Sequence, residues 1–561
     1  MKITRGFSIL KQCVCVLFLF ATNLGAAVIG TNGAVATVHP LATDAAVNAI
    51  KRGGNAVDAA VAAALTLGVV DGHNSGIGGG CFFLVRTGRG SVVAIDGRET
   101  APARATRDMF LRDGKAVPAL SQTGALSIGV PGSLAVYAYA LKHFGKLTLR
   151  DHLLPAAALA RDGFPLDRAY AARLAESAEE LARFPESRRV LLKADSQPYR
   201  AGEILKQPEL SASYEQIAEH GIEWFYQGAF AEKIEQWMRE NSGLITADDF
   251  REYKIALREP IRTRYRDFEI IGFPPPSSGG VHVAQILNTL ENFDLAKHPP
   301  YSVDSIHLIT EAMKLAFADR AFWLGDPDFV RVPRGLISRQ YAAELAKRIT
   351  MDKAIAVPAH GPADQFGTAA FDKHTTHFST ADAEGNWVAC TATVNTSFGS
   401  KVMIPGTGII INNQMDDFSA QPGVANYFGL VGAEANAVEP RKRPLSSMSP
   451  TIILRRGQPI ASLGAAGGPT IISQTIVNII NLLDYKMSLD QALSSPRLHH
   501  QWKPDELRVE TLPTEIHEKL KARGHTVIAV RRAGAAQVVL KTGDHFEAAH
   551  DPRLEGKAAG W

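Results

Sequence analysis

The residues with the clearest potential for chemistry lie two thirds of the way along the chain, where residues 375–379 read Thr-Thr-His-Phe-Ser. A threonine hydroxyl is a poor nucleophile unless a base lies beside it. If the bond between His374 and Thr375 is cut, the freed α-amine of Thr375, with a reference pKa of about 8, can accept the hydroxyl proton at neutral pH. The sequence therefore indicates a latent nucleophile that supplies its own base.

Hydroxyl, amide and carboxylate side chains follow at short range: Thr393, Asn395, Gln414, Asp417, Ser446 and Ser447. Asp417 is the most informative, because a carboxylate next to the apolar Phe418 needs a cationic partner if it is buried. Taken singly, the others have ordinary explanations. The serine pair fits a turn, and Asn395 with Ser397 also matches a glycosylation sequon.

The composition is that of a globular protein, without the clustered basic residues typical of nucleic-acid binding. Of the 561 residues, 46% are hydrophobic, which is enough for a large core. The formal charge of +3 comes from Lys2, Arg5 and Lys11, so the remainder of the chain is neutral. No basic stripe with interleaved aromatic residues occurs, and nucleic acid is not expected as a partner.

Residues 1–27 have the layout of a secretory signal. The basic residues precede an apolar run at 13–21, and the small residues Gly25 and Ala27 precede the expected cleavage point. The apolar run is too short to span a bilayer, so no stable membrane anchor is expected after its removal. We predict an exported protein, periplasmic or secreted, that begins at Val28.

The cysteine and histidine spacings offer no metal or phosphate motif. No CxxC, HExxH, P-loop or EF-hand pattern occurs, and we expect neither a metal nor an organic cofactor. Cys81 and Cys390 remain after the signal, both among small or apolar residues. Two buried free thiols are the expected state, and one disulfide is the alternative.

Periodicity predicts a helix-rich first part and a second part that alternates strands with helices. Expected helices in the first part cover 43–51, 55–69, 133–144, 149–161, 167–183, 222–240, a stretch from about 281, and 303–324, with strands at 81–86, 91–95 and 262–272. Residues 351–374 are polar and aperiodic, which predicts an exposed, cleavable linker. Beyond it, strands are expected at 376–381, 387–394, 408–412, 451–455, 460–463, 526–530 and 536–540, and helices at 470–483, 489–494 and 513–523. Sheets covered by helices on the outside are the economical packing.

Several multi-residue blocks, in order along the chain, resemble the γ-glutamyltransferase (γ-glutamyltranspeptidase) family. They are residues 76–80 (Gly-Ile-Gly-Gly-Gly), 98–103 (Arg-Glu-Thr-Ala-Pro-Ala), 375–379, 412–419 (Asn-Asn-Gln-Met-Asp-Asp-Phe-Ser), 443–451 (Arg-Pro-Leu-Ser-Ser-Met-Ser-Pro-Thr) and 467–468 (Gly-Gly). The resemblance implies an α+β fold, the four-layer αββα sandwich of N-terminal-nucleophile hydrolases. It also implies a precursor that cuts itself into a large subunit, 28–374, and a small subunit, 375–561, which stay together as a heterodimer.

The resemblance also assigns roles around the glutamate end of a γ-glutamyl amide such as glutathione. The α-carboxylate is bound by the guanidinium of Arg98 and the hydroxyls of Ser446 and Ser447. The α-ammonium is bound by the side-chain amides of Asn395 and Gln414 and the carboxylate of Asp417. Thr393 orients the Thr375 hydroxyl. The backbone N–H groups of Gly467 and Gly468 stabilise the oxyanion.

The implied chemistry is a ping-pong reaction through a γ-glutamyl ester on Thr375, without a cofactor. Water resolves the ester in hydrolysis, and the amine of an amino acid or dipeptide resolves it in transpeptidation. Two alternatives differ in class. One is a glutaryl or cephalosporin-type acylase of the same architecture, whose substrate lacks the ammonium that Asp417 would meet. The other is an unprocessed periplasmic binding protein for γ-glutamyl peptides.

One position departs from the family pattern. Residues 419–445 match the lid that shields the site in many bacterial members, but Phe428 stands where the lid usually carries a tyrosine. A phenylalanine can cover a pocket and cannot hydrogen-bond across it. The strength of lid closure is therefore in question, and with it the balance between water and amine acceptors.

Overall fold

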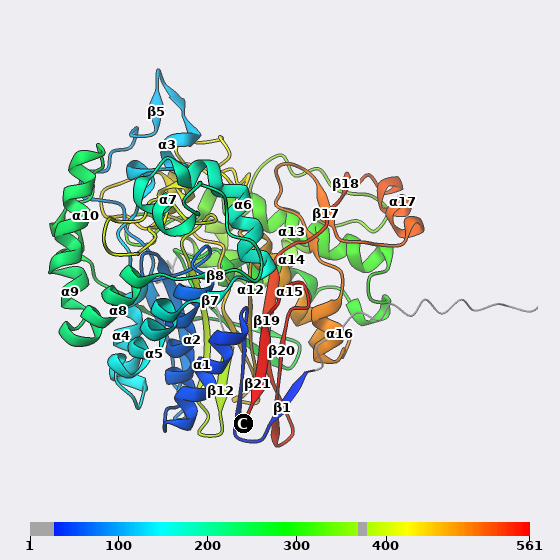
Figure 1. The fold of residues 1–561 in the computed structure, drawn as a ribbon. Helices are drawn as coiled ribbons and strands as arrows, with labels where there is room; N and C mark the ends of the chain where they lie inside the picture. The colour runs from blue at the N-terminus through cyan, green and yellow to red at the C-terminus, as the bar shows by residue number, and fades with distance from the viewer. Residues whose placement is uncertain (1–26, 368–378) are drawn as a thin grey trace, which may run out of the picture.

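The computed structural model describes residues 27–367 and 379–561. Residues 1–26 of the expected export signal, and Thr375 with its neighbours, lie outside the described residues. In the part described, two seven-stranded sheets pack against each other and helices cover their outer faces (Figure 1). This is the four-layer αββα sandwich, in agreement with the predicted fold class.

The two sheets each combine strands from both sides of the gap at 368–378, and neighbouring strands are antiparallel. The first sheet runs in the order β1 (Val28–Gly30), β20 (His545–His550), β19 (Ala535–Thr542), β15 (Gln458–Ala466), β14 (Thr451–Arg455), β11 (Phe268–Gly272) and β10 (Ile261–Tyr265). The second runs β21 (Lys557–Gly560), β2 (Gly33–Thr37), β12 (Ser379–Asp382), β13 (Trp387–Thr393), β3 (Gly80–Arg86), β4 (Val92–Gly97) and β9 (Ala256–Arg258).

The helices form one layer on each sheet. The second sheet is covered by α1 (Pro40–Lys51), α2 (Ala56–Val70) and α4 (Ser133–Phe144), with α5 (Leu149–Asp162) and α8 (Pro208–His220) outside them. The first sheet is covered by α12 (Gly279–Leu290), α15 (Thr470–Leu483) and α16 (Leu489–Ser494), and α13 (Val303–Trp323) and α14 (Arg339–Arg348) pack onto α12.

Smaller elements complete the fold. They are the helices α3 (Pro118–Gln122), α6 (Arg168–Ala182), α7 (Pro185–Leu191), α9 (Glu223–Tyr226), α10 (Ala229–Glu240), α11 (Ala247–Glu252) and α17 (Thr514–Ala522), the hairpins β5 (Leu111–Arg112) with β6 (Lys115–Ala116) and β7 (Phe164–Pro165) with β8 (Ile204–Leu205), and a sheet of β16 (Leu498–His499), β17 (Leu507–Val509) and β18 (Val527–Ala529).

Alternate side chains of the central strands enter two different cores. In β3, Phe82 and Leu84 join the core between the sheets, whereas Cys81, Phe83 and Val85 pack under the helices on the other side. Successive residues of a strand point to opposite faces of the sheet, so a strand buried on both faces reads as a continuous apolar run. Cys81 and Cys390 are buried and free, which confirms the predicted thiols.

Most of the predicted elements are present, and three are wrong. The helix expected at 222–240 is two helices, α9 and α10, which meet at Gly228. The strand expected at 262–272 is the hairpin of β10 and β11, which turns at Arg266 with φ 56°. The strand expected at 408–412 is a loop with a single bridge between Met403 and Ile410.

The segment predicted as an exposed linker is tied to the protein over its described part. The Ala354 N–H donates to the Arg523 carbonyl at 2.7 Å, and the Trp502 indole N–H donates to the Val357 carbonyl at 2.7 Å. The described stretch 351–367 is therefore held to the protein at several points, although many of its residues are exposed as predicted. Its cleavage stays a prediction.

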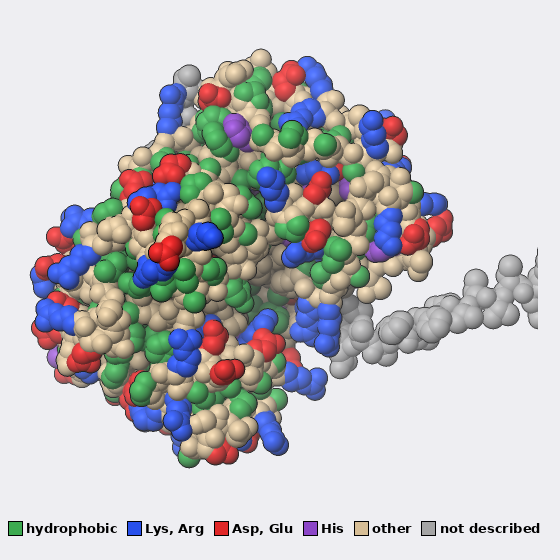
Figure 2. Space-filling view, turned by 90° about the horizontal axis from the view of Figure 1, so that it is seen from above, with side chains coloured by type: hydrophobic (Ala, Val, Ile, Leu, Met, Phe, Trp, Pro, Cys, Tyr) green, Lys and Arg blue, Asp and Glu red, His purple; other side chains and the backbone are tan. Residues whose placement is uncertain are grey.

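Charged side chains of both signs are spread over the surface. On the face in Figure 2, Lys and Arg side chains are interspersed with Asp and Glu, and no stripe of one sign runs across it. Among the described helices, none has both the length and the apolar character needed to cross a bilayer.

Candidate active site

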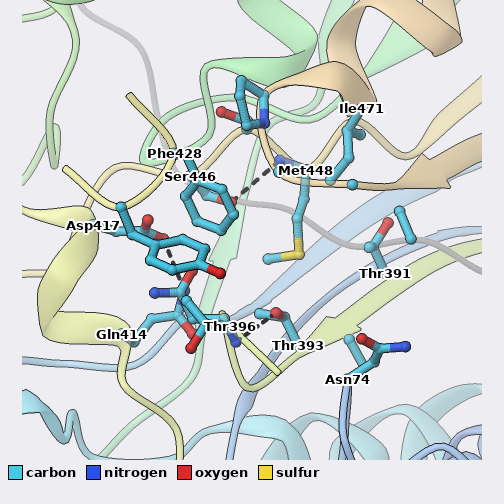
Figure 3. A pocket seen from close by; sticks show the side chains of 18 of the residues that line it. Asn74, Thr391, Thr393, Thr396, Gln414, Asp417, Phe428, Ser446, Met448 and Ile471 are labelled. Atoms are coloured by element: carbon cyan, nitrogen blue, oxygen red, sulfur yellow. Dashed lines mark hydrogen bonds between the residues drawn. The ribbon is translucent and has the colours of Figure 1, made fainter. Parts of the chain in front are cut away.

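A cavity of about 250 Å³ lies where the C-terminal ends of β13 and β15 meet the segments 414–430 and 446–448. It is lined by every predicted site residue that the structure describes: Arg98, Thr393, Asn395, Gln414, Asp417, Ser446, Ser447, Gly467 and Gly468. Gln414 and Asp417 lie on the same side as Phe428, with Thr391 and Asn74 opposite (Figure 3). The structure thus brings these nine residues together, and Thr375 lies outside the described residues.

Arg98 forms the charged floor of the cavity. It follows β4 directly and is fully buried. Its Nε donates to the Pro444 carbonyl at 3.0 Å, and its Nη2 donates to Asp417 Oδ2 at 2.5 Å. Its Nη1 has no hydrogen-bond partner among the described residues. One N–H face of the guanidinium is therefore unsatisfied, although the rest of the side chain is held rigidly.

Asp417 receives a second donor from its own short helix. The 3₁₀ turn Gln414–Asp417 places both side chains on one face, and Gln414 Nε2 donates to Asp417 Oδ2 at 2.8 Å. The Gln414 carbonyl oxygen is buried without a partner within the described part of the chain. The predicted cationic partner of Asp417 is Arg98, and the acceptor oxygens beside the pair can meet an ammonium.

Glu99 lies behind this pair as a second buried acid. Its carboxylate is 3.6 Å from Arg98 Nη1. Burial raises the pKa of Glu99 to about 8, against the opposing effect of Arg98. The side chain is therefore mostly protonated at neutral pH, and Asp417 is left as the anion that pairs with Arg98.

The serine pair is clamped between two loops. The Ser446 N–H donates to the Pro276 carbonyl, and the Ser278 N–H donates to the Ser446 carbonyl, both at 2.8 Å. Behind Ser447 lies Arg320 in the last turn of α13, whose Nη2 donates to Ser447 Oγ at 3.0 Å. Backbone pairing therefore fixes both hydroxyls at the cavity wall.

Thr393 and Asn395 form the edge of the cavity at the end of β13. Asn395 has a left-handed backbone, φ 81°, and its N–H donates to Thr393 Oγ1 at 2.8 Å. Its Nδ2 donates to the Asn413 carbonyl at 3.1 Å. The amide nitrogen that a glycan would require is thus engaged inside the protein, which disfavours the sequon interpretation. The Thr393 oxygen accepts one hydrogen bond, and its own hydrogen has no acceptor among the described residues.

Gly467 and Gly468 connect β15 to α15 with backbone angles that favour glycine, φ 133° and φ 59°. A side chain at Gly468 would meet the Phe428 ring at 2.7 Å. The pair precedes the N-terminus of a fourteen-residue helix, where backbone N–H groups and the helix dipole favour negative charge. This is suitable geometry for an oxyanion site.

The lid segment lies over this glycine pair through Phe428. The Asn426 side chain accepts from the N–H groups of Phe428 and Leu430, both at 3.1 Å. Gln501, in the loop after β16, donates from its Nε2 to the carbonyls of Gly429 at 3.0 Å and Phe428 at 3.3 Å. The lid is thus held through its backbone, without a side-chain hydrogen bond from position 428.

Besides lining residues such as Asn74, Arg173 and Thr391, the sequence did not point to two residues that act from behind the cavity, Arg320 and Gln501. Each acts from an element remote in sequence from its partner, α13 and the loop after β16. A signal existed only for Arg320, which is a charged residue inside a helix buried almost all round.

The αββα sandwich with a polar cavity at one end of its central strands defines the class of N-terminal-nucleophile hydrolases. The sequence profile described as Gamma-glutamyltranspeptidase matches residues 42–561. The chain belongs to the γ-glutamyltranspeptidase family, and it is an enzyme of that kind.

Two curated relatives and one solved structure illustrate the range of similar proteins. The "Glutathione hydrolase proenzyme" of Escherichia coli (strain K12) is 44% identical, covering 93% of this chain and 90% of that protein. The "Acylase ACY 1 proenzyme" of Pseudomonas sp. (strain V22) is 40% identical, covering 91% of this chain and 90% of that protein. The cephalosporin acylase structure from Bacillus halodurans has a TM-score of 0.86 at 27% identity, covering 100% of this chain and 99% of that one.

Proposed function

We propose that this enzyme cuts its own chain between His374 and Thr375 and then transfers or hydrolyses the γ-glutamyl group of glutathione and related amides. The observation that carries this proposal is the pairing of Arg98 with Asp417 at 2.5 Å beside Gln414 and the serine pair. A buried cation and anion side by side complement an α-amino acid group, which presents both charges a few ångströms apart.

In the reaction, Thr375 Oγ attacks the γ-carbonyl carbon while its hydroxyl proton passes to the Thr375 α-amine. The N–H groups of Gly467 and Gly468 stabilise the tetrahedral oxyanion, each worth about 3–4 kcal/mol in comparable sites. The C–N bond then breaks as the α-ammonium returns the proton to the leaving amine. Water, or an acceptor amine, attacks the resulting ester and regenerates the threonine.

The acylase alternative draws support from the relatives of that name. A glutaryl group keeps the carboxylate that Arg98 would bind and lacks the ammonium. Asp417 and the unsatisfied Gln414 oxygen would then have no partner in the substrate. This favours the γ-glutamyl substrate. The binding-protein alternative is set aside, because the family to which the chain belongs consists of enzymes.

The proposal extends to processing and location. The two products would be residues 28–374 and 375–561, held together as a heterodimer. Export of the protein to the periplasm or the medium would follow from the signal at residues 1–27.

A denaturing gel, terminal sequencing and three donors test the proposal together. Wild-type protein should give two fragments, one of which starts at Thr375, whereas Thr375→Ala should give one uncut chain without activity. Thr375→Ser, which keeps a hydroxyl, should still cut itself. A fully active, uncut wild-type chain would exclude self-cleavage as the source of the nucleophile.

The donors are γ-glutamyl, glutaryl and 4-aminobutyryl amides of one chromogenic amine, so that each lacks at most one charge. Wild type should prefer the γ-glutamyl donor over both others. Asp417→Ala should lower kcat/KM for the γ-glutamyl donor about 100-fold or more, as for loss of one partner of a buried charge pair, and affect the glutaryl donor far less. Equal losses on these two donors would assign Asp417 another role.

A further inference from the structure

Arg320 is a buried cation directly behind the serine pair. Its Nη2 donates to Ser447 Oγ and its Nε to Ser278 Oγ, both at 3.0 Å. Ser278 Oγ in turn donates to the Ser446 carbonyl at 2.7 Å. Within residues 27–367 and 379–561 no carboxylate forms an ion pair with Arg320. Its guanidinium is therefore bound to the two serine hydroxyls through hydrogen bonds alone.

The direction of these hydrogen bonds fixes what Ser447 can do. A guanidinium has only donors, so Ser447 Oγ must accept from Arg320. The hydroxyl hydrogen of Ser447 has no acceptor among the described residues, and the side chain lines the cavity. Ser446 Oγ similarly accepts from the Met448 N–H at 3.2 Å. Both oxygens thus accept from inside the protein, which leaves the two hydroxyl hydrogens available to a ligand in the cavity that both residues line.

The charges around the cavity also favour an anion beside Ser447. Two guanidinium groups, those of Arg98 and Arg320, lie near one carboxylate, that of Asp417, which is paired with Arg98. A third guanidinium in the cavity lining, that of Arg173, has its own carboxylate partner, Glu176. Burial lowers the pKa of Arg320 to about 10, an effect that Asp417 opposes, and the group is still charged at neutral pH. A buried charge without a partner is unfavourable, so an anion bound beside Ser447 would be stabilised.

We propose that Arg320 is a positioning residue for the α-carboxylate of the donor, acting through Ser447. It holds the Ser447 hydroxyl as a hydrogen-bond donor and adds a second positive charge on the carboxylate side of the cavity. Arg98 contacts the same carboxylate directly. This inference rests on the proposed function. It predicts that α13 contributes to recognition of the donor's carboxylate and not of its ammonium.

The competing explanation is that Arg320 only ties α13 to the loops at 278 and 446–447. Such a tie would affect all donors equally. The three donors of one chromogenic amine separate the two explanations, because the γ-glutamyl and glutaryl donors carry the carboxylate and the 4-aminobutyryl donor lacks it.

Arg320→Gln should raise KM for the γ-glutamyl and glutaryl donors about 10- to 100-fold, as expected for the loss of charge-assisted hydrogen bonds. KM for the 4-aminobutyryl donor should change less than about threefold, within the spread of context effects. Asp417→Asn is the matched control and should show the opposite pattern, with the glutaryl donor spared. An equal rise of KM on all three donors in Arg320→Gln would overturn the proposal.

A double-mutant cycle tests the route through Ser447. If Arg320 acts through that hydroxyl, adding Arg320→Gln to Ser447→Ala should raise KM for the γ-glutamyl donor by no more than about threefold. Fully multiplicative effects would contradict this route. Arg320→Lys, which retains the charge without the planar fork, provides the same readout if the glutamine variant fails to fold, with a smaller loss and the same donor selectivity expected.

The wild-type enzyme distinguishes this proposal from the proposed function. If wild type does not prefer the γ-glutamyl donor over the 4-aminobutyryl donor, the proposed function fails before any variant is made. If wild type has that preference and Arg320→Gln keeps it, only the role of Arg320 is refuted.

Discussion

Two buried clusters of charge lie at opposite ends of α13 and differ in how their charges are satisfied. At the cavity, Arg98 Nη1 and the Gln414 oxygen lack partners among the described residues, and Arg320 has no ion pair there. Near the start of the helix, His307, Glu311 and His525 lie close enough to suggest a metal site. In that second cluster the groups engage one another: Glu311 Oε1 has no hydrogen bond among the described residues, but the Lys314 ammonium lies 3.1 Å from it.

The hydrogen bonds of the second cluster follow one consistent set of tautomers. His307 Nε2 must donate to the Thr350 carbonyl at 2.7 Å, so its Nδ1 accepts from His525 Nε2, also at 2.7 Å. Burial lowers the pKa of His525 to about 3, which keeps that ring neutral. Lys314 Nζ pairs with Glu311 at 3.1 Å. The ligand atoms are thus engaged with each other and with an ammonium, which fits a structural tie better than a metal centre.

The comparison teaches that unsatisfied polar atoms, rather than buried charge as such, mark the binding site. Both clusters are buried and both contain opposite charges. Glu311 Oε1 faces the Lys314 ammonium, whereas Arg98 Nη1 and the Gln414 oxygen lack a partner among the described residues and belong to side chains that line the 250 Å³ cavity. Three substitutions test this distinction.

The largest expected effect is on stability, in the closed cluster. Lys314→Met leaves Glu311 buried without its cation and should lower the free energy of unfolding by about 3–5 kcal/mol. Denaturant unfolding measures this loss, and kcat/KM for the γ-glutamyl donor should stay within about twofold because no cavity residue changes. The double variant Glu311→Gln with Lys314→Met should regain much of the stability. A selective loss of activity in folded Lys314→Met would show that the two clusters are not separate.

An intermediate effect is expected at the lid. Gln501→Ala removes the donor to the carbonyls of Phe428 and Gly429, and the amide is itself held by His499 Nε2 at 2.9 Å. Losing hydrogen bonds worth about 1 kcal/mol should raise the ratio of hydrolysis to transpeptidation about fivefold, because a looser lid admits water. Product analysis with a dipeptide acceptor measures this ratio. Phe428→Tyr is the opposing variant and should lower the ratio. If the ratio is unchanged in both variants, the lid does not control the choice between water and the acceptor amine.

The smallest effect is a pH dependence from Glu99. Its pKa is raised to about 8 in the folded protein, so the favourable protonated state is lost as pH rises through that value. Between pH 7 and pH 9 the wild type gains a negative charge 3.6 Å from Arg98. KM for the γ-glutamyl donor should rise about twofold more in wild type than in Glu99→Gln, which cannot ionise, since added negative charge opposes carboxylate binding. Parallel pH profiles of the two proteins would rule out this titration.

Sequence reasoning found the parts of the site that lie in local blocks. The fold class followed from family resemblance, and the nine described site residues line one cavity, seven of them in those blocks and the other two, Thr393 and Asn395, at the end of β13. The need of Asp417 for a cation was also predicted from its apolar neighbours, and Arg98 meets it. The roles of these residues, and the nucleophile Thr375, stay predictions.

The features that were missed depend on contacts between remote segments or on weak local breaks. Arg320 meets Ser447 across 126 intervening positions, so no local pattern reports the pair. The turn at Arg266 contains neither Gly nor Pro, so no strong break signal separates the two strands. A single glycine, Gly228, ends a helix that otherwise keeps its period.

The mixed strand order of the two sheets determines what a break in the backbone can do. In the first sheet β11, from before residue 368, pairs with β14, from after it; in the second, β2 pairs with β12 and β21. A chain cut between residues 374 and 375 would therefore consist of two pieces that share both sheets, each piece supplying strands that pair with strands of the other. Neither dilution nor a mild chaotrope should release one piece intact, because separating them means dismantling both sheets. The association of the pieces and the folding of the enzyme would be a single equilibrium.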